Sequence, residues 1–170
     1  MNAFKSLIQF DELDSTNDFA RDHLDELENH AVVVAKHQRK GRGQYERTWE
    51  SDTGKNLLFS ILFKEEIPSQ TISHIAVLSL IETLHHFEIE ASFKLPNDIL
   101  VGKDKIAGML IETKYEMERR TSLILGIGLN VNQVVFQTER ATSMKKISAI
   151  DYSLDEVLKV FLEKLDLNLF

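Results

Sequence analysis

The segment 94–108, which reads KLPNDILVGKDKIAG, constrains the fold more than any other part of the chain. Gly102-Lys103 can form a two-residue turn with Gly at its first central position, as a type II′ hairpin requires. The turn predicts that Val101 lies opposite Asp104, Leu100 opposite Lys105, and Asp98 opposite Ala107. Because strand side chains alternate between faces, Asp98 and Lys105 would then project from the same face within reach of each other. We therefore expect a carboxylate and an ammonium group held together on rigid backbone.

Pro96 interrupts the strand that precedes this hairpin. Proline restricts Leu95 to extended backbone and donates no hydrogen bond of its own. The interruption predicts that the Asn97 side chain is free to point away from the neighbouring strands.

The hydrophobic pattern predicts one domain over residues 1–170, since 170 residues at 43% hydrophobic can enclose a full core. Strands are expected at 4–13, 31–36, 56–64, 91–95, 99–101, 106–115 and 121–131. Helices are expected at 15–28, 68–87 and 153–167, and residues 38–55 are expected to form a loop. Strands that follow one another, with helices between some of them, predict an α+β fold whose mixed, largely antiparallel sheet has helices packed on it.

Composition excludes several classes of protein. The chain has no cysteine, so disulfides, thiolate metal sites and cysteine nucleophiles are excluded. Its longest apolar run, residues 57–63, contains Ser60 and is too short to span a bilayer, so we expect a cytoplasmic protein that is not bound to a membrane. The net charge of −7 argues against a general affinity for nucleic acid.

Positive charge is nevertheless concentrated in one short region. Its members are Lys36, Arg39, Lys40, Arg42 and Arg47, opposed there by a single Glu46. In an acidic protein, such a loop predicts a small anionic ligand.

The hairpin and three further blocks resemble the biotin protein ligases. The further blocks are Ser15-Thr16-Asn17, residues 38–49, and Gly126-Ile127-Gly128-Leu129-Asn130, and all of them come in the family's order. Members of this family activate biotin with ATP and attach it to a lysine of a biotin carboxyl carrier protein domain. The resemblance implies a ligase with a catalytic domain similar to the class II aminoacyl-tRNA synthetases. It also implies biotin, ATP and Mg²⁺ as ligands, and it makes a homodimer plausible.

The chain departs from the family pattern in two blocks. The family usually has Lys-Trp-Pro-Asn-Asp, and this chain has Leu95 in place of the tryptophan. In the glycine-rich loop, Gln44 stands where the family has its second arginine and Glu46 where it has its third glycine. Many members also continue into a small C-terminal β-barrel, and some begin with a DNA-binding helix-turn-helix domain. We expect neither in this sequence, and so no repressor function.

The resemblance assigns catalysis to Lys105 and Arg42. Lys105 stands in the family's Lys-x-Ala-Gly pattern, and its ammonium could bridge the biotin carboxylate and the α-phosphate of ATP. The planar guanidinium of Arg42 could bind carboxylate or phosphate oxygens. On the hairpin alone, Lys105 could equally be a solvated lysine beside a turn.

The biotin site implied by the resemblance combines uncharged hydrogen-bonding groups with glycines. Its members are Ser15, Thr16, Asn17, Gln38, Gly41, Arg42, Gly43, Lys105, Gly108, Gly126 and Gly128. A ureido ring offers two N–H donors and one carbonyl, which such side chains match. Ser15 and Thr16 could instead only cap a helix, and the glycines of the last block could be packing residues in a buried strand.

The nucleotide site implied by the resemblance consists of Arg42, Arg47, Trp49, Asn97 and Asn130. No metal site is certain, although Asp98 could hold Mg²⁺ through water. Two other functions stay open. One is a lipoate-type ligase, and the other is a biotin-binding module whose adenylation is weakened by Gln44 and Glu46.

Overall fold

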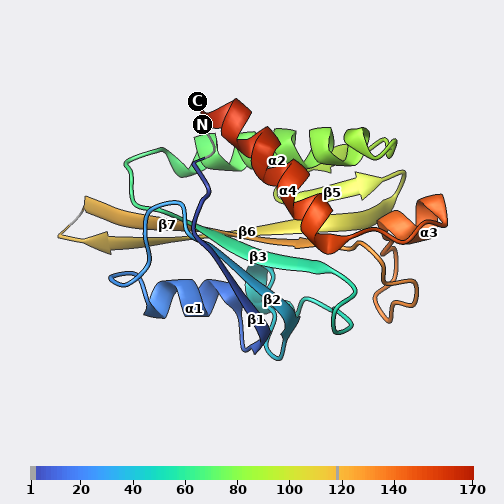
Figure 1. Ribbon diagram of the computed structural model, residues 1–170, viewed down its shortest axis with the longest axis horizontal. Coiled ribbons are helices and arrows are strands. Elements are labelled where there is room, and N and C mark those ends of the chain that lie inside the picture. The colour runs from blue at the N-terminus through green and yellow to red at the C-terminus, as the bar shows by residue number, and fades with distance from the viewer. Residues whose placement is uncertain (1–2, 118) are drawn as a thin grey trace.

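The computed structural model describes residues 3–117 and 119–170, and it describes only the backbone of Glu46 and Arg119. A seven-stranded sheet runs through the molecule in the order β1-β2-β3-β7-β6-β5-β4 (Figure 1). The strands are β1 (Leu7–Leu13), β2 (Val32–Gln38), β3 (Leu57–Phe63), β4 (Ser92–Lys94), β5 (Asp98–Val101), β6 (Asp104–Glu116) and β7 (Arg119–Leu129). Only β1 and β2 pair in parallel, and the other pairs are antiparallel. The predicted α+β fold with a mixed, largely antiparallel sheet is confirmed.

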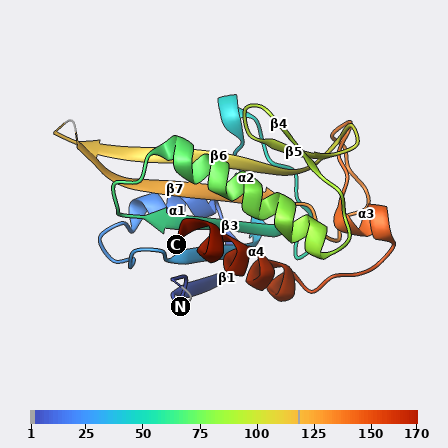
Figure 2. The ribbon, with the colours of Figure 1, turned by 90° about the horizontal axis from the view of Figure 1, so that it is seen from above.

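Helices cover both faces of the sheet. They are α1 (Thr16–Asp22), α2 (Ser69–His86), α3 (Met144–Ser148) and α4 (Leu154–Leu169), with a short 3₁₀ turn, η1, at Gln44–Glu46. Helices α2 and α4 lie together on one face, and α1 lies on the other (Figures 1 and 2). None of the described helices is long and apolar enough to cross a membrane.

Two apolar clusters hold these layers together. The larger one joins the sheet to α2 and α4 and includes Phe59, Leu80 and Phe161, while the smaller one lies under α1 around Ala20 and Leu62. Every residue of β3 is buried, because this central strand has covered faces on both sides. Burial of each large apolar side chain contributes on the order of 1.5–3 kcal/mol, so this double-layered core accounts for most of the fold's stability.

The first helix is shorter than predicted. It ends at Asp22, where the His23 backbone leaves helical geometry and its N–H still donates to Phe19 O. Continuation to Glu28 would have put the carboxylates of Asp25, Glu26 and Glu28 in the last turn, where the helix dipole disfavours negative charge. Strand boundaries shift as well, since β1 begins at Leu7 and not at Phe4, and α3 was not predicted.

The hairpin of β5 and β6 has the predicted turn but not the whole predicted register. Gly102 has a φ of 61°, and Val101 pairs with Asp104 and Leu100 with Lys105, as expected. The register then shifts between Ile99 and Leu100, so that Ile99 pairs with Ala107 and Asp98 with Gly108. The predicted pairing of Asp98 with Ala107 was wrong, because β6 has one extra residue, Ile106, at this bulge.

Candidate functional site

A cavity of about 420 Å³ opens on the face of the sheet that carries α1. Its walls come from the start of α1, the loop after β2, the junction of β4 and β5, the middle of β6 and β7, and residues 136–141. Every predicted site residue except Gly41 lines it. Gly41 is buried behind the wall, where its carbonyl oxygen accepts a 2.9 Å hydrogen bond from the Trp49 N–H. The fold therefore gathers segments that are far apart in the sequence around one space.

One end of the cavity is lined by uncharged polar groups. Gln38 Oε1 accepts hydrogen bonds from Thr16 N at 2.7 Å and from Thr16 Oγ1 at 3.1 Å, and Ser60 Oγ lies 2.7 Å from Thr16 Oγ1. Ser15 caps α1 by accepting from Asp18 N and also lines the cavity, so its two proposed roles are compatible. We call the lining residues Ser15, Thr16, Asn17 and Gln38, together with the fully buried Ser60 that hydrogen-bonds to Thr16 and Asn17, the polar end.

Asn17 is fixed in orientation at this end. Its Nδ2 donates to Glu112 Oε2 at 2.7 Å and lies 3.4 Å from Leu110 O, while its Oδ1 accepts from Ser60 Oγ at 2.6 Å. The amide packs directly on Gly126, where an added Cβ would come within 2.9 Å of Asn17 Cγ. A glycine is required here because no side chain fits between this strand and the Asn17 amide.

Ser60 and Glu112 were not among the predicted site residues. Ser60 had left a signal, since it is the one hydroxyl inside an otherwise apolar central strand, and a fully buried hydroxyl needs a partner. Little in the sequence indicated Glu112, because β6 is exposed from Thr113 onward and a carboxylate near an exposed strand end is common.

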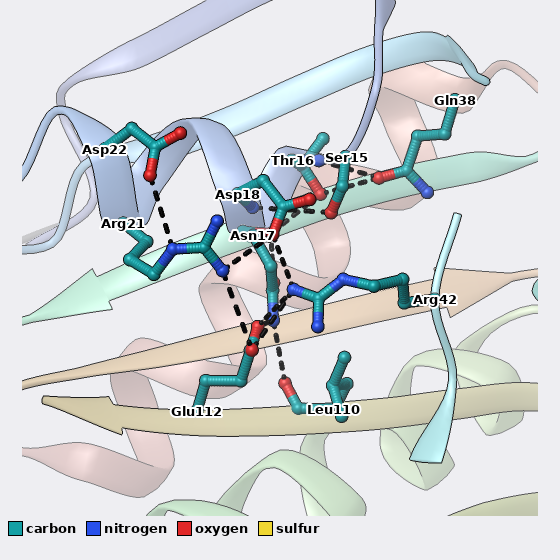
Figure 3. Close-up of polar contacts among 11 residues, drawn as sticks. Ser15, Thr16, Asn17, Asp18, Arg21, Asp22, Gln38, Arg42, Leu110 and Glu112 are labelled. Carbon is teal, nitrogen blue, oxygen red and sulfur yellow. Dashed lines mark hydrogen bonds and ion pairs between the residues drawn. The ribbon is translucent and has the colours of Figure 1, made fainter. Parts of the chain in front are cut away.

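Arg42 is held by carboxylates. Its Nη2 lies 2.6 Å from Asp18 Oδ1 and 2.9 Å from Glu112 Oε2. Figure 3 shows Arg42 and Arg21 approaching Glu112 from opposite sides, with Asn17 between the helix and the carboxylate. The ion pairs tie the loop after β2 to α1 and β6, and they bring this guanidinium to the edge of the polar end.

Most of the positive charge predicted for an anionic ligand is paired within the protein. Lys36 pairs with Asp11, and both Arg39 and Lys40 pair with Asp14. Hydrogen bonds from Arg39 and Lys40 lower the pKa of Asp14. Carboxylates at the end of β1 and directly after it therefore neutralise part of the loop. The prediction of a small anionic ligand now depends on Arg42 and Arg47, which line the cavity, and it stays a prediction. Arg47 lines the cavity and has no ion pair among the described side chains.

Trp49 forms the floor of the cavity's middle. Its ring lies against Gly108 and Gly128, where an added Cβ would approach the indole to 2.9 Å and 2.5 Å respectively. The indole Nε1 is buried and has no hydrogen-bond partner among the described residues. Such an orphaned donor is unusual, and a polar ligand in the cavity would satisfy it.

Lys105 stands beside this floor. Its Nζ lies 2.6 Å from Asp98 Oδ1 and 5.2 Å from the centroid of the Trp49 ring. Its backbone is fixed from the other side, because Lys105 N donates to Arg140 O and Thr142 N donates to Lys105 O. The predicted proximity of Asp98 and Lys105 is confirmed, and the ammonium faces the cavity from rigid backbone.

The two asparagines of the predicted nucleotide site behave differently. Asn97 donates from Nδ2 to Met109 O at 2.7 Å, so the expectation that its side chain is free of the neighbouring strand was wrong: the chain after Pro96 bends onto β6. Asn130 donates to Thr142 O at 3.0 Å, and its buried Oδ1 has no partner among the described residues. They line what we call the outer end together with Lys94, a weaker candidate from the hairpin segment, and with Phe136 and Arg140, which the sequence did not indicate.

The described residues do not form a metal site. No group of three or more Asp, Glu or His side chains among them could hold an ion. Asp98, the one candidate ligand, is engaged by Lys105. The side chain of Glu46, whose charge departs from the family pattern, lies outside the described residues, and the positive φ in its loop, 55°, belongs to Tyr45.

Known proteins are similar to this chain in sequence and in fold. The profile of the Biotin/lipoate A/B protein ligase family matches residues 8–131. The bifunctional ligase/repressor BirA of Bacillus subtilis is 36% identical over 136 residues, which are 75% of this chain and 41% of that protein. The chain thus spans about two fifths of that relative's length.

Solved structures agree. The biotin protein ligase from Aquifex aeolicus in complex with biotin and ATP superposes with a TM-score of 0.85 at 34% identity, over 98% of this chain and 71% of that one. The biotin acetyl coenzyme A carboxylase synthetase of Helicobacter pylori gives a TM-score of 0.76 at 27% identity, over 97% and 75%. The sequence match extends over more than half of the chain and includes the α1, loop and hairpin segments that build the cavity, and the chain belongs to the biotin/lipoate A/B protein ligase family.

Proposed function

We propose that this chain activates biotin with ATP, forming biotinyl-5′-AMP, and transfers the biotinyl group to a lysine of a biotin carboxyl carrier protein domain. The observation that carries the proposal is the position of Lys105, whose ammonium stands between an uncharged polar end and an outer end lined by cations, an aromatic ring and amides. The names of the relatives support it, since the Aquifex aeolicus structure holds biotin and ATP.

The polar end suits the ureido ring of biotin. Thr16, Gln38 and Asn17 present oxygens and amide nitrogens without a formal charge, and a ureido group needs both donors and acceptors of this kind. A dithiolane ring, as in lipoate, has no N–H or carbonyl group, so it would cover these polar groups without forming hydrogen bonds to them. This difference favours biotin over the lipoate-type alternative.

The outer end suits ATP. Asn130 Oδ1 at this end and Trp49 Nε1 in the adjoining middle of the cavity are buried polar atoms without partners among the described residues, one an acceptor and the other a donor. Arg47, Arg140 and Lys94 line the same region and supply positive charge for phosphates. Because one paired carboxylate does not make a magnesium site, we propose that Mg²⁺ is held mainly by the ATP phosphates.

In the first step, a carboxylate oxygen of biotin attacks the α-phosphorus of ATP, and the bond to the bridging oxygen of pyrophosphate breaks. Two anions must meet in this step, so catalysis consists mainly of positioning and of positive charge. Lys105 supplies that charge, and Asp98 keeps its ammonium oriented. In the second step, the amine of the carrier lysine attacks the acyl carbon, and AMP leaves.

Calorimetry and product analysis test this proposal. Biotin should bind the purified protein without ATP, and lipoate should not. Incubation with biotin and MgATP should give biotinyl-5′-AMP by mass spectrometry, and addition of a carrier domain should give a biotinylated lysine. Binding of biotin without any adenylate would favour the alternative of a binding module, and binding of lipoate alone would move the chain to the lipoate branch.

A further inference from the structure

Two segments that line the cavity, residues 49–56 and 130–142, run side by side although they are far apart in the sequence. Buried amides join them at one end: Asn56 Oδ1 accepts from Val131 N at 3.0 Å, and Gln133 Oε1 accepts from Asn56 Nδ2 at 2.7 Å and from Asp52 N at 2.9 Å. These contacts fix the base of the second segment. They do not reach its tip, residues 136–139.

Glu50 holds the tip. Its Oε1 accepts from Gln137 N at 2.7 Å, and its Oε2 accepts from Thr138 N at 2.9 Å and from Thr138 Oγ1 at 2.7 Å. Within the described chain, the hydrogen bonds that Gln137 and Thr138 make to other segments all go to this carboxylate. Val134 and Val135, just before the tip, are exposed, whereas Phe136 is partly buried and its ring centroid lies 5.5 Å from Lys146 Nζ. Glu50 is therefore the tether of Gln137 and Thr138 in particular.

The tip matters because it roofs the outer end. Phe136, Thr138 and Arg140 line the same cavity as Asn97 and Asn130. The segment then returns to Lys105, since Arg140 O accepts from Lys105 N at 2.7 Å. Glu50 directly follows Trp49 in the sequence. Two consecutive residues of the loop therefore line the middle of the cavity and hold the tip of the second segment.

The charge of Glu50 strengthens the tether. Burial is the largest single influence and raises the pKa of Glu50, but the hydrogen bonds from Gln137 and Thr138 together outweigh it and hold the pKa below its ordinary value. An ionised acceptor forms stronger hydrogen bonds than a neutral one.

We propose that Glu50 is a positioning residue that holds residues 136–140 over the outer end of the cavity and so prepares it for ATP. The inference rests on the proposed function for the identity of the ligand. It assigns to Glu50 an effect on nucleotide binding that the polar end does not share, because Glu50 contacts none of the residues of that end.

The test compares Glu50→Ala and Glu50→Gln with Asp52→Asn, which removes a carboxylate from the same loop. The exposed Asp52 side chain has no hydrogen bond or ion pair among the described residues, which makes it a matched control. Two quantities are measured: amide hydrogen exchange at Gln137 and Thr138 in the ligand-free protein, and the KM values for ATP and biotin in pyrophosphate exchange. Thermal unfolding verifies that each variant is folded.

For Glu50→Ala we expect faster exchange at both amides and a KM for ATP raised about tenfold, the effect of losing hydrogen bonds to one charged group. The KM for biotin should stay within about twofold, because Glu50 contacts none of the residues of the polar end. A change of about twofold corresponds to less free energy than one hydrogen bond typically contributes. Glu50→Gln retains one carbonyl acceptor and should recover part of the loss, while Asp52→Asn should match the wild type.

Unchanged amide exchange in Glu50→Ala, or equal increases in the KM values for biotin and ATP, would overturn the inference. The proposed function would still stand if the wild-type protein formed the adenylate. A wild-type protein that adenylates nothing would overturn the proposed function and the nucleotide role of Glu50 with it. In that case, faster exchange in Glu50→Ala would still identify the tether of the segment.

Discussion

Lys105 Nζ lies 2.6 Å from Asp98 Oδ1, across a hairpin whose tight turn begins at Gly102. The bulge at Ile106 changes which residue faces Asp98 but leaves the two charged groups together. An ion pair between two strands restricts the lysine more than a flexible loop would, so little reorganisation is needed when anions enter the cavity. The side chains of Lys105 and Asp98 are 35% and 24% exposed, which keeps the ammonium accessible to anions that enter the cavity.

Replacement of Lys105 by Ala should nearly abolish adenylate formation. Loss of one charged group that stabilises a developing negative charge costs on the order of 2–4 kcal/mol, or about thirtyfold to nearly a thousandfold in rate. The fold should persist, because the side chain of Lys105 is not part of the apolar core. Single-turnover formation of biotinyl-5′-AMP measures the effect.

Lys94→Ala is the comparison, since Lys94 also lines the cavity but from its outer rim. We expect a smaller loss, expressed mainly in the affinity for ATP. Equal rates for wild type and Lys105→Ala would remove Lys105 from the mechanism.

Gly126→Ala should impair the polar end. The added methyl group would collide with the Asn17 amide, which is fixed by Ser60 and Glu112 and cannot move away cheaply. We expect biotin affinity to fall by about fivefold or more, because overpacking of such a site typically costs about 1–3 kcal/mol. Isothermal titration with biotin provides the measurement.

Gly54→Ala separates this steric effect from backbone strain. Gly54 has a φ of 70° and open space around its Cα, so alanine there is strained but touches nothing. The variant should lose about 1 kcal/mol of stability from the left-handed backbone and bind biotin normally. If both glycine variants weakened biotin binding alike, the collision with Asn17 would not be the cause.

Glu112→Gln should loosen the loop after β2. The substitution leaves one oxygen for Asn17 but removes the charge that pairs with Arg42. We expect a loss in biotin affinity of about 1–2 kcal/mol, as for a hydrogen bond to a charged group. Glu116→Gln on the same strand removes an exposed carboxylate that pairs with Lys114 and should change the affinity by less than about 0.5 kcal/mol. A Glu112 variant with wild-type affinity would mean that the position of Arg42 does not matter for biotin.

The amides of Gln137 and Thr138 should report the ionisation of Glu50. Since the hydrogen bonds outweigh burial and lower the folded pKa below its ordinary value of 4.5, the tether stabilises the folded chain above that value and is lost as the pH falls through the lowered pKa. Their NMR shifts should therefore be constant at neutral pH and change with a midpoint below 4.5. The step should be absent in Glu50→Gln, and a midpoint above the ordinary value would contradict the described contacts.

The parts of this fold that were predictable are those that local chemistry decides. The Gly102 turn required a particular backbone geometry, and the run of β3, apolar except for Ser60, required burial on both faces. The proximity of Asp98 and Lys105 followed from the turn even though the register did not. A bulge depends on the packing of Ile106 in the core, which no local pattern encodes.

The parts that were not predictable depend on partners distant in the sequence. Arg39 and Arg42 contributed to the prediction of an anionic ligand. In the structure, Arg39 forms an ion pair with Asp14, and Arg42 forms ion pairs with Asp18 and Glu112, which only the fold brings close to it. Similarly, Glu50 and Thr138 are 88 positions apart, and neither stands in a recognisable motif. Resemblance located the polar end and Lys105, whereas the roof of the outer end emerged from the structure.

Biotin-dependent exchange of labelled pyrophosphate into ATP tests the central claim most directly, because it reports formation of the adenylate without any carrier protein. The purified chain should catalyse exchange with biotin and MgATP, should not do so with lipoate, and should lose the activity in Lys105→Ala. Exchange that depends on lipoate instead of biotin, or biotin binding with no exchange at all, would contradict the proposal that Lys105 joins these two ligands in one reaction.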